Sequence, residues 1–282
     1  MSIDKIIESF FGYIVWIALL KFFPNKRRLD AALEIECPKP LQIGWNPHVA
    51  LGDIFILEST SQKSVSHAWK FTLRNIKKEN IRSLNVSWKY NFEIEELKKF
   101  AADNLHDFCH NASYDSIELS SEIRENMVTI TGKKRKVGGE DNFKTPFFLE
   151  ADGENKINSI GDSESKEVNL PDGIVNSIII YCLSLSNQNS KLQNQNPLSY
   201  HLLPSITLKI SYYLESVHHT KITQTIKING KIRVWNFVRI NEEPAKDLAA
   251  LVTFDEIDYD KQKIEINHSA FDSVKSWSRK KP

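Results

Sequence analysis

The sequence lacks most of the patterns that reveal a protein's chemistry directly. Its three cysteines, Cys37, Cys109 and Cys182, are odd in number and far apart, which argues against a disulfide framework and a paired-cysteine zinc site. It contains no G-x-x-x-x-G-K-S/T phosphate loop, no G-x-G-x-x-G fingerprint and no H-E-x-x-H helix. These absences argue against nucleotide hydrolysis, dinucleotide chemistry and zinc proteolysis. The unpaired cysteines favour a reducing compartment.

An excess of one charge is also missing. Lys and Arg total 37, and Asp and Glu total 36, so the chain as a whole has no electrostatic attraction to nucleic acid. Hydrophobic residues make up 41% and charged residues 26%, which is typical of a globular protein and argues against disorder. Binding partners must therefore be sought in local patches.

One long hydrophobic run is present, residues 6–23 with the sequence IIESFFGYIVWIALLKFF. As a helix this run would be roughly 27 Å long, close to the thickness of a bilayer's hydrocarbon core. Its only charges, Glu8 and Lys21, lie near its ends, and Pro24 follows it and would end a helix. The run predicts a single transmembrane helix. The alternatives are a buried or self-associating hydrophobic helix, a helix lying on the membrane surface, and a signal peptide.

The cations around this run predict its orientation. Lys21, Lys26, Arg27 and Arg28 lie at or beyond its C-terminal end, whereas Lys5 alone precedes it. Because the cytoplasmic flanks of membrane spans are rich in Lys and Arg, we expect a single-pass membrane protein with a cytoplasmic C-terminal body. The basic flank would contact anionic lipids of the bilayer.

Apolar and polar residues alternate over two stretches of the body. Residues 67–75 read HAWKFTLRN and residues 83–90 read SLNVSWKY, a period of two that predicts half-buried β-strands. The polar residues 75–80 between them are typical of a turn. We therefore expect Trp69 and Trp88 to meet inside one antiparallel β-sandwich core.

Helical spacing appears once, over residues 93–110, where apolar residues recur every third or fourth position after a Glu-rich start. This spacing predicts one amphipathic helix between strands.

Residues 152–169 are small, polar and charged, which favours a linker or long loop. Asn229 and Gly230 separate two alternating stretches and predict the type I′ turn of a β-hairpin.

The predicted fold class is therefore mainly β, with an N-terminal transmembrane helix followed by antiparallel β-sandwich-like modules and one amphipathic helix. We expect residues 1–28 to form the membrane anchor and its basic flank. Residues 29–155 would form a β-sandwich-like domain that includes helix 93–110, and residues 156–282 a second β-rich domain. Within the second domain, residues 186–197 are rich in side-chain amides and favour a flexible loop.

Three potential metal ligands lie near the end of the predicted helix. His106, Cys109 and His110 have a spacing that places them on one helical face. Imidazole and thiolate groups bind zinc, but a closed site needs a fourth ligand, and the sequence does not indicate one. The alternative is a small buried Cys109 beside solvated histidines. The sequence therefore implies no cofactor.

A basic cluster, Lys133, Lys134, Arg135 and Lys136, precedes the residues GGED. At the tip of a hairpin such cations can bind phosphate or another anion, and glycines expose backbone N–H groups. A solvated tip without a ligand is the alternative. A second basic stretch, residues 279–281, lies close to the C-terminus, and the fold decides whether it can approach the membrane.

These features favour a binding protein over an enzyme. No complete catalytic motif is present, whereas β-sandwiches expose edges and loops to proteins and ligands. We expect a membrane-anchored cytoplasmic binding or sensing module that contacts a protein partner or a second copy of itself. A component of a bacterial stress or antiviral defence system would have this layout. The alternatives are a membrane-disrupting effector acting through its hydrophobic helix, and a hydrolase or nuclease with an unfamiliar site.

Overall fold

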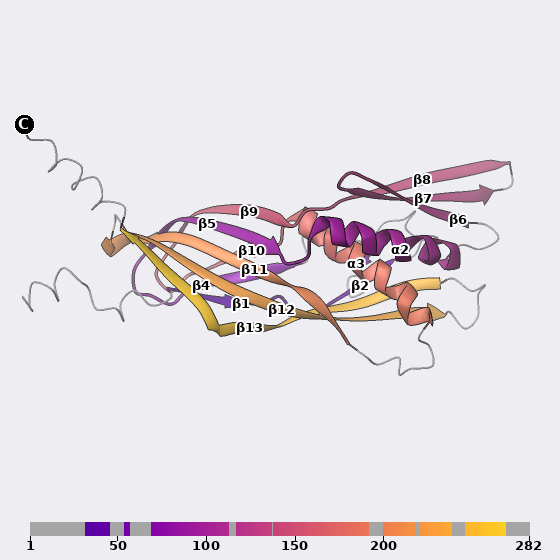
Figure 1. Cartoon of the computed structure of the whole chain (residues 1–282). Helices are drawn as coiled ribbons and strands as arrows, with labels where there is room; N and C mark the ends of the chain where they lie inside the picture. Colours follow the sequence, from indigo (N-terminus) through magenta and orange to yellow (C-terminus); the bar gives the residue numbers. More distant parts are fainter. Residues whose placement is uncertain are drawn as a thin grey trace, which may run out of the picture.

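The alternating stretches of the sequence form antiparallel strands. The computed structural model describes residues 32–45, 54–56, 69–112, 117–136, 138–191, 200–217, 220–238 and 246–268. Within these residues the chain forms three antiparallel sheets and two α-helices (Figure 1). The prediction of a mainly β fold is confirmed.

The largest sheet, sheet B, has seven strands in the order β3-β2-β13-β12-β11-β5-β9. All neighbouring pairs in it are antiparallel. Its strands are β2 (Leu41–Trp45), β3 (Ile54–Ile56), β5 (Ile81–Tyr90), β9 (Asp152–Ile160), β11 (His201–Leu214), β12 (Thr220–Val238) and β13 (Lys246–His268). The short 3₁₀ helix η3 (Glu215–Val217) follows β11.

Two smaller sheets accompany sheet B. Sheet A has the order β1-β4-β10, and sheet C has the order β6-β7-β8. Sheet A consists of β1 (Leu33–Glu36), β4 (Lys70–Asn75) and β10 (Ser165–Asn169). Sheet C consists of β6 (Ile117–Arg124), β7 (Met127–Lys136) and β8 (Gly139–Phe148).

Aromatic side chains join sheet A to sheet B. Phe71 of β4 lies with its ring centroid 5.0 Å from that of Trp88 and 5.6 Å from that of Phe254. Trp69, immediately before β4, meets Phe254 edge to face at 5.8 Å. Trp69 and Trp88 are 0% and 1% exposed and belong to one continuous core. The prediction that the two tryptophans share one core is confirmed, and Phe71 and Phe254 link them between the two sheets.

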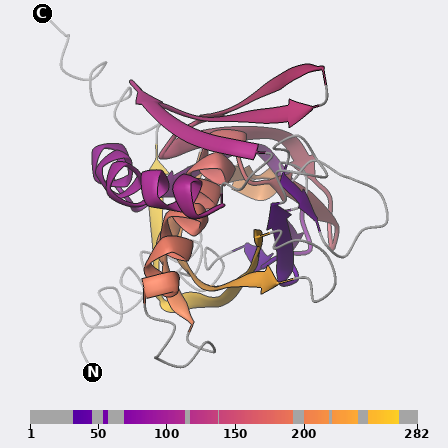
Figure 2. The ribbon, with the colours of Figure 1, turned by 90° about the vertical axis from the view of Figure 1, so that its right-hand side faces the viewer.

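Two helices complete the body. One contacts sheets B and C, and the other contacts that helix and β6 of sheet C. In α2 (Ile94–Ala112), the buried residues Leu97, Ala101, Leu105 and Cys109 repeat every four positions, so they form one apolar stripe. In α3 (Asp172–Lys191), nearly every residue from 174 to 185 is buried. The reason is that α3 contacts α2, β8, β9 and β12. Viewed along the body, both helices lie beneath sheet C (Figure 2).

Two expectations for the middle of the chain are wrong. The sequence predicted one helix, and the described residues contain a second one, α3. Residues 152–169 were expected to form a linker, but they form β9 and β10. In β9, exposed residues alternate with half-buried ones, because this strand lies at the edge of sheet B. A polar edge strand therefore has the composition of a loop.

The expected hairpin at Asn229 and Gly230 is also wrong. Strand β12 continues through these residues and pairs with β11 on one side and β13 on the other. The β12–β13 register shifts between Asn229 and Gly230, which marks a bulge or irregularity. A Cβ atom on Gly230 would lie 3.0 Å from Leu203 and 3.1 Å from Phe254. Gly230 therefore allows neighbouring strands to pack closely and does not form a turn.

Some predictions concern residues outside the described part of the chain. The hydrophobic run 6–23 and its flank, with Lys21, Lys26, Arg27 and Arg28, lie there. Among the helices that the structure describes, none is both long and apolar enough to cross a membrane. The domain boundary at residue 155 stays a prediction, and it would have to separate β5 from β11, which pair within sheet B.

The aromatic contact between sheets A and B gives a first prediction. Changing Trp69 or Trp88 to Ala should lower the free energy of unfolding by about 3–5 kcal/mol, because both side chains are fully buried. Ile76→Ala, at a side chain that is 53% exposed, is the control and should cost under about 0.5 kcal/mol. Denaturant titration of the three variants measures this, and wild-type midpoints for both Trp variants would contradict the shared core.

The bulge in β12 gives a second prediction. Gly230→Ala should destabilise the protein by about 1–3 kcal/mol, because the new methyl group would crowd Leu203, Phe254 and the Thr253 carbonyl. Gly139→Ala is the control, since a Cβ atom there meets nothing within 4 Å. Thermal unfolding compares the two variants. Equal stability would contradict the close packing around Gly230.

Candidate functional site

Three turns meet at one end of the body, and we call this end the terminal pole. The turns are residues 76–80, 161–164 and 215–217. Asn75 lies at their centre, 1% exposed. Its side-chain amide donates hydrogen bonds to the carbonyl oxygens of Glu79 and Gly161, both at 2.8 Å, and its Oδ1 accepts one from the Lys77 N–H at 2.9 Å. Loss of this amide would leave partly buried backbone groups without these partners, at a cost of up to about 1–3 kcal/mol each.

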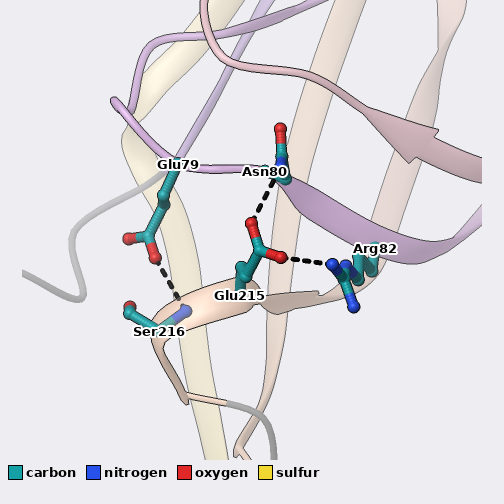
Figure 3. Close-up of polar contacts among 5 residues, drawn as sticks. All are labelled: Glu79, Asn80, Arg82, Glu215 and Ser216. Carbon is teal, nitrogen blue, oxygen red and sulfur yellow. Dashed lines mark hydrogen bonds and ion pairs between the residues drawn. The ribbon is translucent and has the colours of Figure 1, made fainter.

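A second set of polar contacts ties η3 to the turn before β5 (Figure 3). The Glu215 carboxylate accepts hydrogen bonds from Arg82 and from the Asn80 side chain, the latter at 2.7 Å. The Glu79 carboxylate accepts one from the Ser216 N–H at 3.0 Å. The Arg82 and Glu215 side chains are 54% and 37% exposed, so their ion pair contributes only about 0–1 kcal/mol. These contacts align the turns more than they stabilise the fold.

Both ends of the described body lie at the terminal pole. The Ala32 carbonyl accepts a hydrogen bond from the Ile76 N–H at 3.0 Å, and the Ala32 N–H donates one to the Tyr212 hydroxyl at 3.1 Å. Strand β13 ends at His268, which pairs with Thr220 just after η3. Segments 1–31 and 269–282 therefore join the body at the same end.

The basic cluster lies at the other end, which we call the hairpin end. The hairpin of β7 and β8 projects there, away from β4 and β10 (Figure 1), and Gly138 in its turn has a φ of 100°. Lys133–Lys136 form the end of β7, and the turn of the hairpin follows them. In register, acidic residues lie beside three of the cations, namely Glu118 beside Lys133, Asp141 beside Lys134 and Glu140 beside Arg135. Contact of Lys133–Lys136 with phosphate or another anion stays a prediction.

The three potential metal ligands have different surroundings. Cys109 is 1% exposed, and burial raises the pKa of its thiol to about 11, although a hydrogen bond with Ser121 acts in the opposite direction. The His106 side chain is 84% exposed, with its Nδ1 3.7 Å from an oxygen of Asp107. The side chain of His110 lies outside the described part. Among the described side chains, no group of three His, Cys, Asp or Glu residues could hold a metal ion.

An aromatic cluster that sequence reasoning missed lies where β5, α2 and α3 meet. Phe92 contacts Tyr90 and Tyr181 edge to face, at 6.3 and 5.6 Å between ring centroids, and Phe100 lies 5.4 Å from Tyr181. The Tyr181 hydroxyl donates a long hydrogen bond, 3.4 Å, to the carbonyl oxygen of Leu202. Burial raises the pKa of Tyr90 well above its usual value. Phe92, Phe100 and Tyr181 remain half-buried.

Two exposed apolar residues lie at and just before the start of β11, where the Leu202 carbonyl contacts Tyr181. Leu202 is 76% exposed, and Tyr200, two residues earlier, is 53% exposed. We call Phe92, Phe100, Tyr181, Tyr200 and Leu202 the junction patch. Aromatic side chains that are partly exposed in a group are typical of protein-binding surfaces. No sequence pattern could indicate this patch, because its members come from four separate segments.

The buried thiols give a third prediction. Burial raises the pKa of Cys109 to about 11 and that of Cys182 to about 12, from 9.0. Only the thiolate is nucleophilic, so both should resist alkylation at pH 8, whereas Cys37, which is half-buried, should react first. Mass spectrometry of the alkylated peptides measures this, with unfolded protein as the control. Rapid labelling of Cys109 in folded protein would contradict its burial.

The same thiols predict how stability changes with pH. A thiol whose pKa is higher in the folded state stays protonated there while the unfolded chain ionises. Its contribution is therefore complete below pH 9.0 and is lost as the pH rises toward about 11 for Cys109 and about 12 for Cys182. Denaturation midpoints should fall over that range, and Cys109→Ala should reduce the fall.

Comparison with known proteins found no relative of this chain. No protein-family model matches the chain, and no curated protein or solved structure is significantly similar to it.

Proposed function

We propose that the chain is a membrane-anchored binding module. Residues 6–23 cross the bilayer once, the body lies in the cytoplasm, and the face with the junction patch binds a protein. The observation that carries this proposal is that the two ends of the body are different. Ala32 lies at the terminal pole, whereas the helices and sheet C occupy the other end (Figure 1).

The tether between the proposed span and the body is short. Residues 24–31 lie between them, and eight residues extend at most about 26–29 Å. Three of them, Lys26, Arg27 and Arg28, are cationic and would remain at anionic headgroups. The terminal pole is thus held near the membrane, and the hairpin end points into the cytoplasm.

The junction patch supplies the contact area for a partner. Aromatic side chains give large contact area with few rotatable bonds and dominate the binding energy of many interfaces. Lys133–Lys136, beyond the patch on the hairpin, would add steering by charge. Nothing in this arrangement needs a cofactor. The expected role in a bacterial stress or antiviral defence system stays a prediction.

Photo-crosslinking from the membrane-bound protein tests this proposal. A photoreactive residue at Leu202 should give an adduct of one defined mass in intact cells, and the same residue at Ile76, which is also exposed but lies at the terminal pole, should not. An adduct of twice the chain's mass would identify the partner as a second copy. Adducts from Ile76 alone would place the binding surface at the terminal pole and contradict binding at the junction patch.

Fractionation and span replacement test the anchor. Full-length protein should sediment with membranes, and an unrelated span of equal length with the same flanking charges should preserve the Leu202 adduct. A soluble full-length protein would overturn the anchor. Loss of the adduct with membrane attachment retained would favour the alternative in which the hydrophobic helix itself acts.

A further inference from the structure

The hydroxyl group of Tyr90 lies buried beside the junction patch without a hydrogen-bond partner. Tyr90, at the end of β5, is 1% exposed, and none of the described residues donates to its hydroxyl oxygen or accepts from it. The hydroxyls of Ser177 and Ser184 on α3 are equally buried, but each donates to the carbonyl oxygen four residues earlier. A buried polar group without a partner is rare in native proteins and costs stability, so it calls for an explanation.

The surroundings of this hydroxyl connect it to the junction patch. The Tyr90 ring meets Phe92 edge to face, with 6.3 Å between the ring centroids, and Phe92 meets Tyr181 in the same way at 5.6 Å. Burial is the main cause of the raised pKa of Tyr90, and Cys182 and Tyr181 on α3 add to it. The hydroxyl therefore lies close to α3, next to two aromatic residues of the patch that are only half-buried.

The side chain of Tyr181 is weakly held. Its hydroxyl donates to the Leu202 carbonyl oxygen at 3.4 Å, beyond the roughly 2.5–3.0 Å that is typical of hydrogen bonds between oxygen atoms. Its ring otherwise contacts two half-buried rings, those of Phe92 and Phe100. Side chains at a surface change rotamer readily. Rotation of Tyr181 toward solvent would lose one weak hydrogen bond and would open a route to the Tyr90 hydroxyl.

The environment of this hydroxyl favours a neutral hydrogen-bond acceptor over a charged one. None of the five residues of the junction patch carries a charge. Burial raises the pKa of Tyr181 as well as that of Tyr90, because a phenolate is poorly solvated among apolar groups. A carboxylate brought to this place would lose its hydration in the same way. A neutral carbonyl oxygen can accept a hydrogen bond there without that loss.

We propose that Tyr90 is the hydrogen-bond donor of the junction patch, and that the protein partner inserts an apolar side chain with a neutral amide carbonyl, which accepts from the Tyr90 hydroxyl. This inference rests on the proposed function and names the chemistry of the partner. Tyr181 turns aside on binding and gives up its contact with the Leu202 carbonyl. Pairing of the Tyr90 hydroxyl removes the cost of leaving it unpaired, which corresponds to about 5- to 150-fold in affinity.

Tyr90→Phe removes the hydroxyl and keeps the ring. Because the hydroxyl has no partner among the described residues, the melting temperature of this variant should equal or exceed that of the wild type. Tyr212→Phe is the matched control, since the buried Tyr212 hydroxyl accepts a hydrogen bond from the Ala32 N–H. It should lower the melting temperature by about 2–4 °C or more. An equal fall in Tyr90→Phe would show that its hydroxyl is paired in the free protein and would overturn the proposal.

Benzamide and benzoate serve as binding probes, because both place a carbonyl oxygen on an aromatic ring and only benzoate is charged. Each is titrated into full-length protein in phosphatidylcholine nanodiscs, and broadening of the probe's NMR signals measures binding. Benzamide should bind wild type and Tyr212→Phe equally, and Tyr90→Phe about 5- to 150-fold more weakly. Equal binding of benzamide to wild type and Tyr90→Phe, including binding to neither, would overturn the proposal, as would tighter binding of benzoate.

The photo-crosslink from Leu202 separates this inference from the proposed function. Adding Tyr90→Phe should reduce the yield of the adduct in cells, whereas adding Tyr212→Phe should leave the yield unchanged. An adduct that persists in full with Tyr90→Phe would refute the role of Tyr90 and leave binding at the junction patch standing. Benzamide binding that depends on Tyr90, in a protein that gives no adduct, would refute the protein partner and the proposed function, and would leave Tyr90 as the donor to a small neutral ligand.

Discussion

The aromatic contact between sheets A and B is the constraint on which the other features depend. Phe71 on β4 packs against Trp88 on β5, yet β4 and β5 belong to different sheets. The turn between these consecutive strands must therefore cross the end of the sandwich. The buried side-chain amide of Asn75 holds this turn by donating hydrogen bonds to the carbonyl oxygens of Glu79 and Gly161. The terminal pole is thus a consequence of core packing, and it fixes the place where both chain ends leave.

Local periodicity predicted those parts of the fold that have one buried face. The alternation around Trp69 and Trp88 gave β4, β5 and their shared core, because each strand is covered on one side only. The stripe of α2 was readable for the same reason. In each case the spacing of apolar residues within the element itself indicates which face is buried, whichever elements pack against that face.

Elements whose character depends on distant segments were not predictable. Helix α3 is apolar almost all round because α2 and strands of sheets B and C enclose it, so no helical period appears. Asn229 and Gly230 have the local preference of a turn, but pairing of β12 along both sides overrides it. The junction patch is still harder to predict from the sequence, since it exists only where β5, α2, α3 and β11 come together.

The length of the central strands separates the two ends of the molecule electrostatically. Strand β12 has 19 residues and so extends about 60 Å, whereas charges are screened within about 8 Å at physiological salt. A ligand at the basic hairpin therefore cannot act on charges at the terminal pole through the electric field. Coupling between the ends would have to pass through sheet B itself, and its paired strands resist bending. Continuous pairing of β11, β12 and β13 would carry a change in orientation from one end of the body to the other.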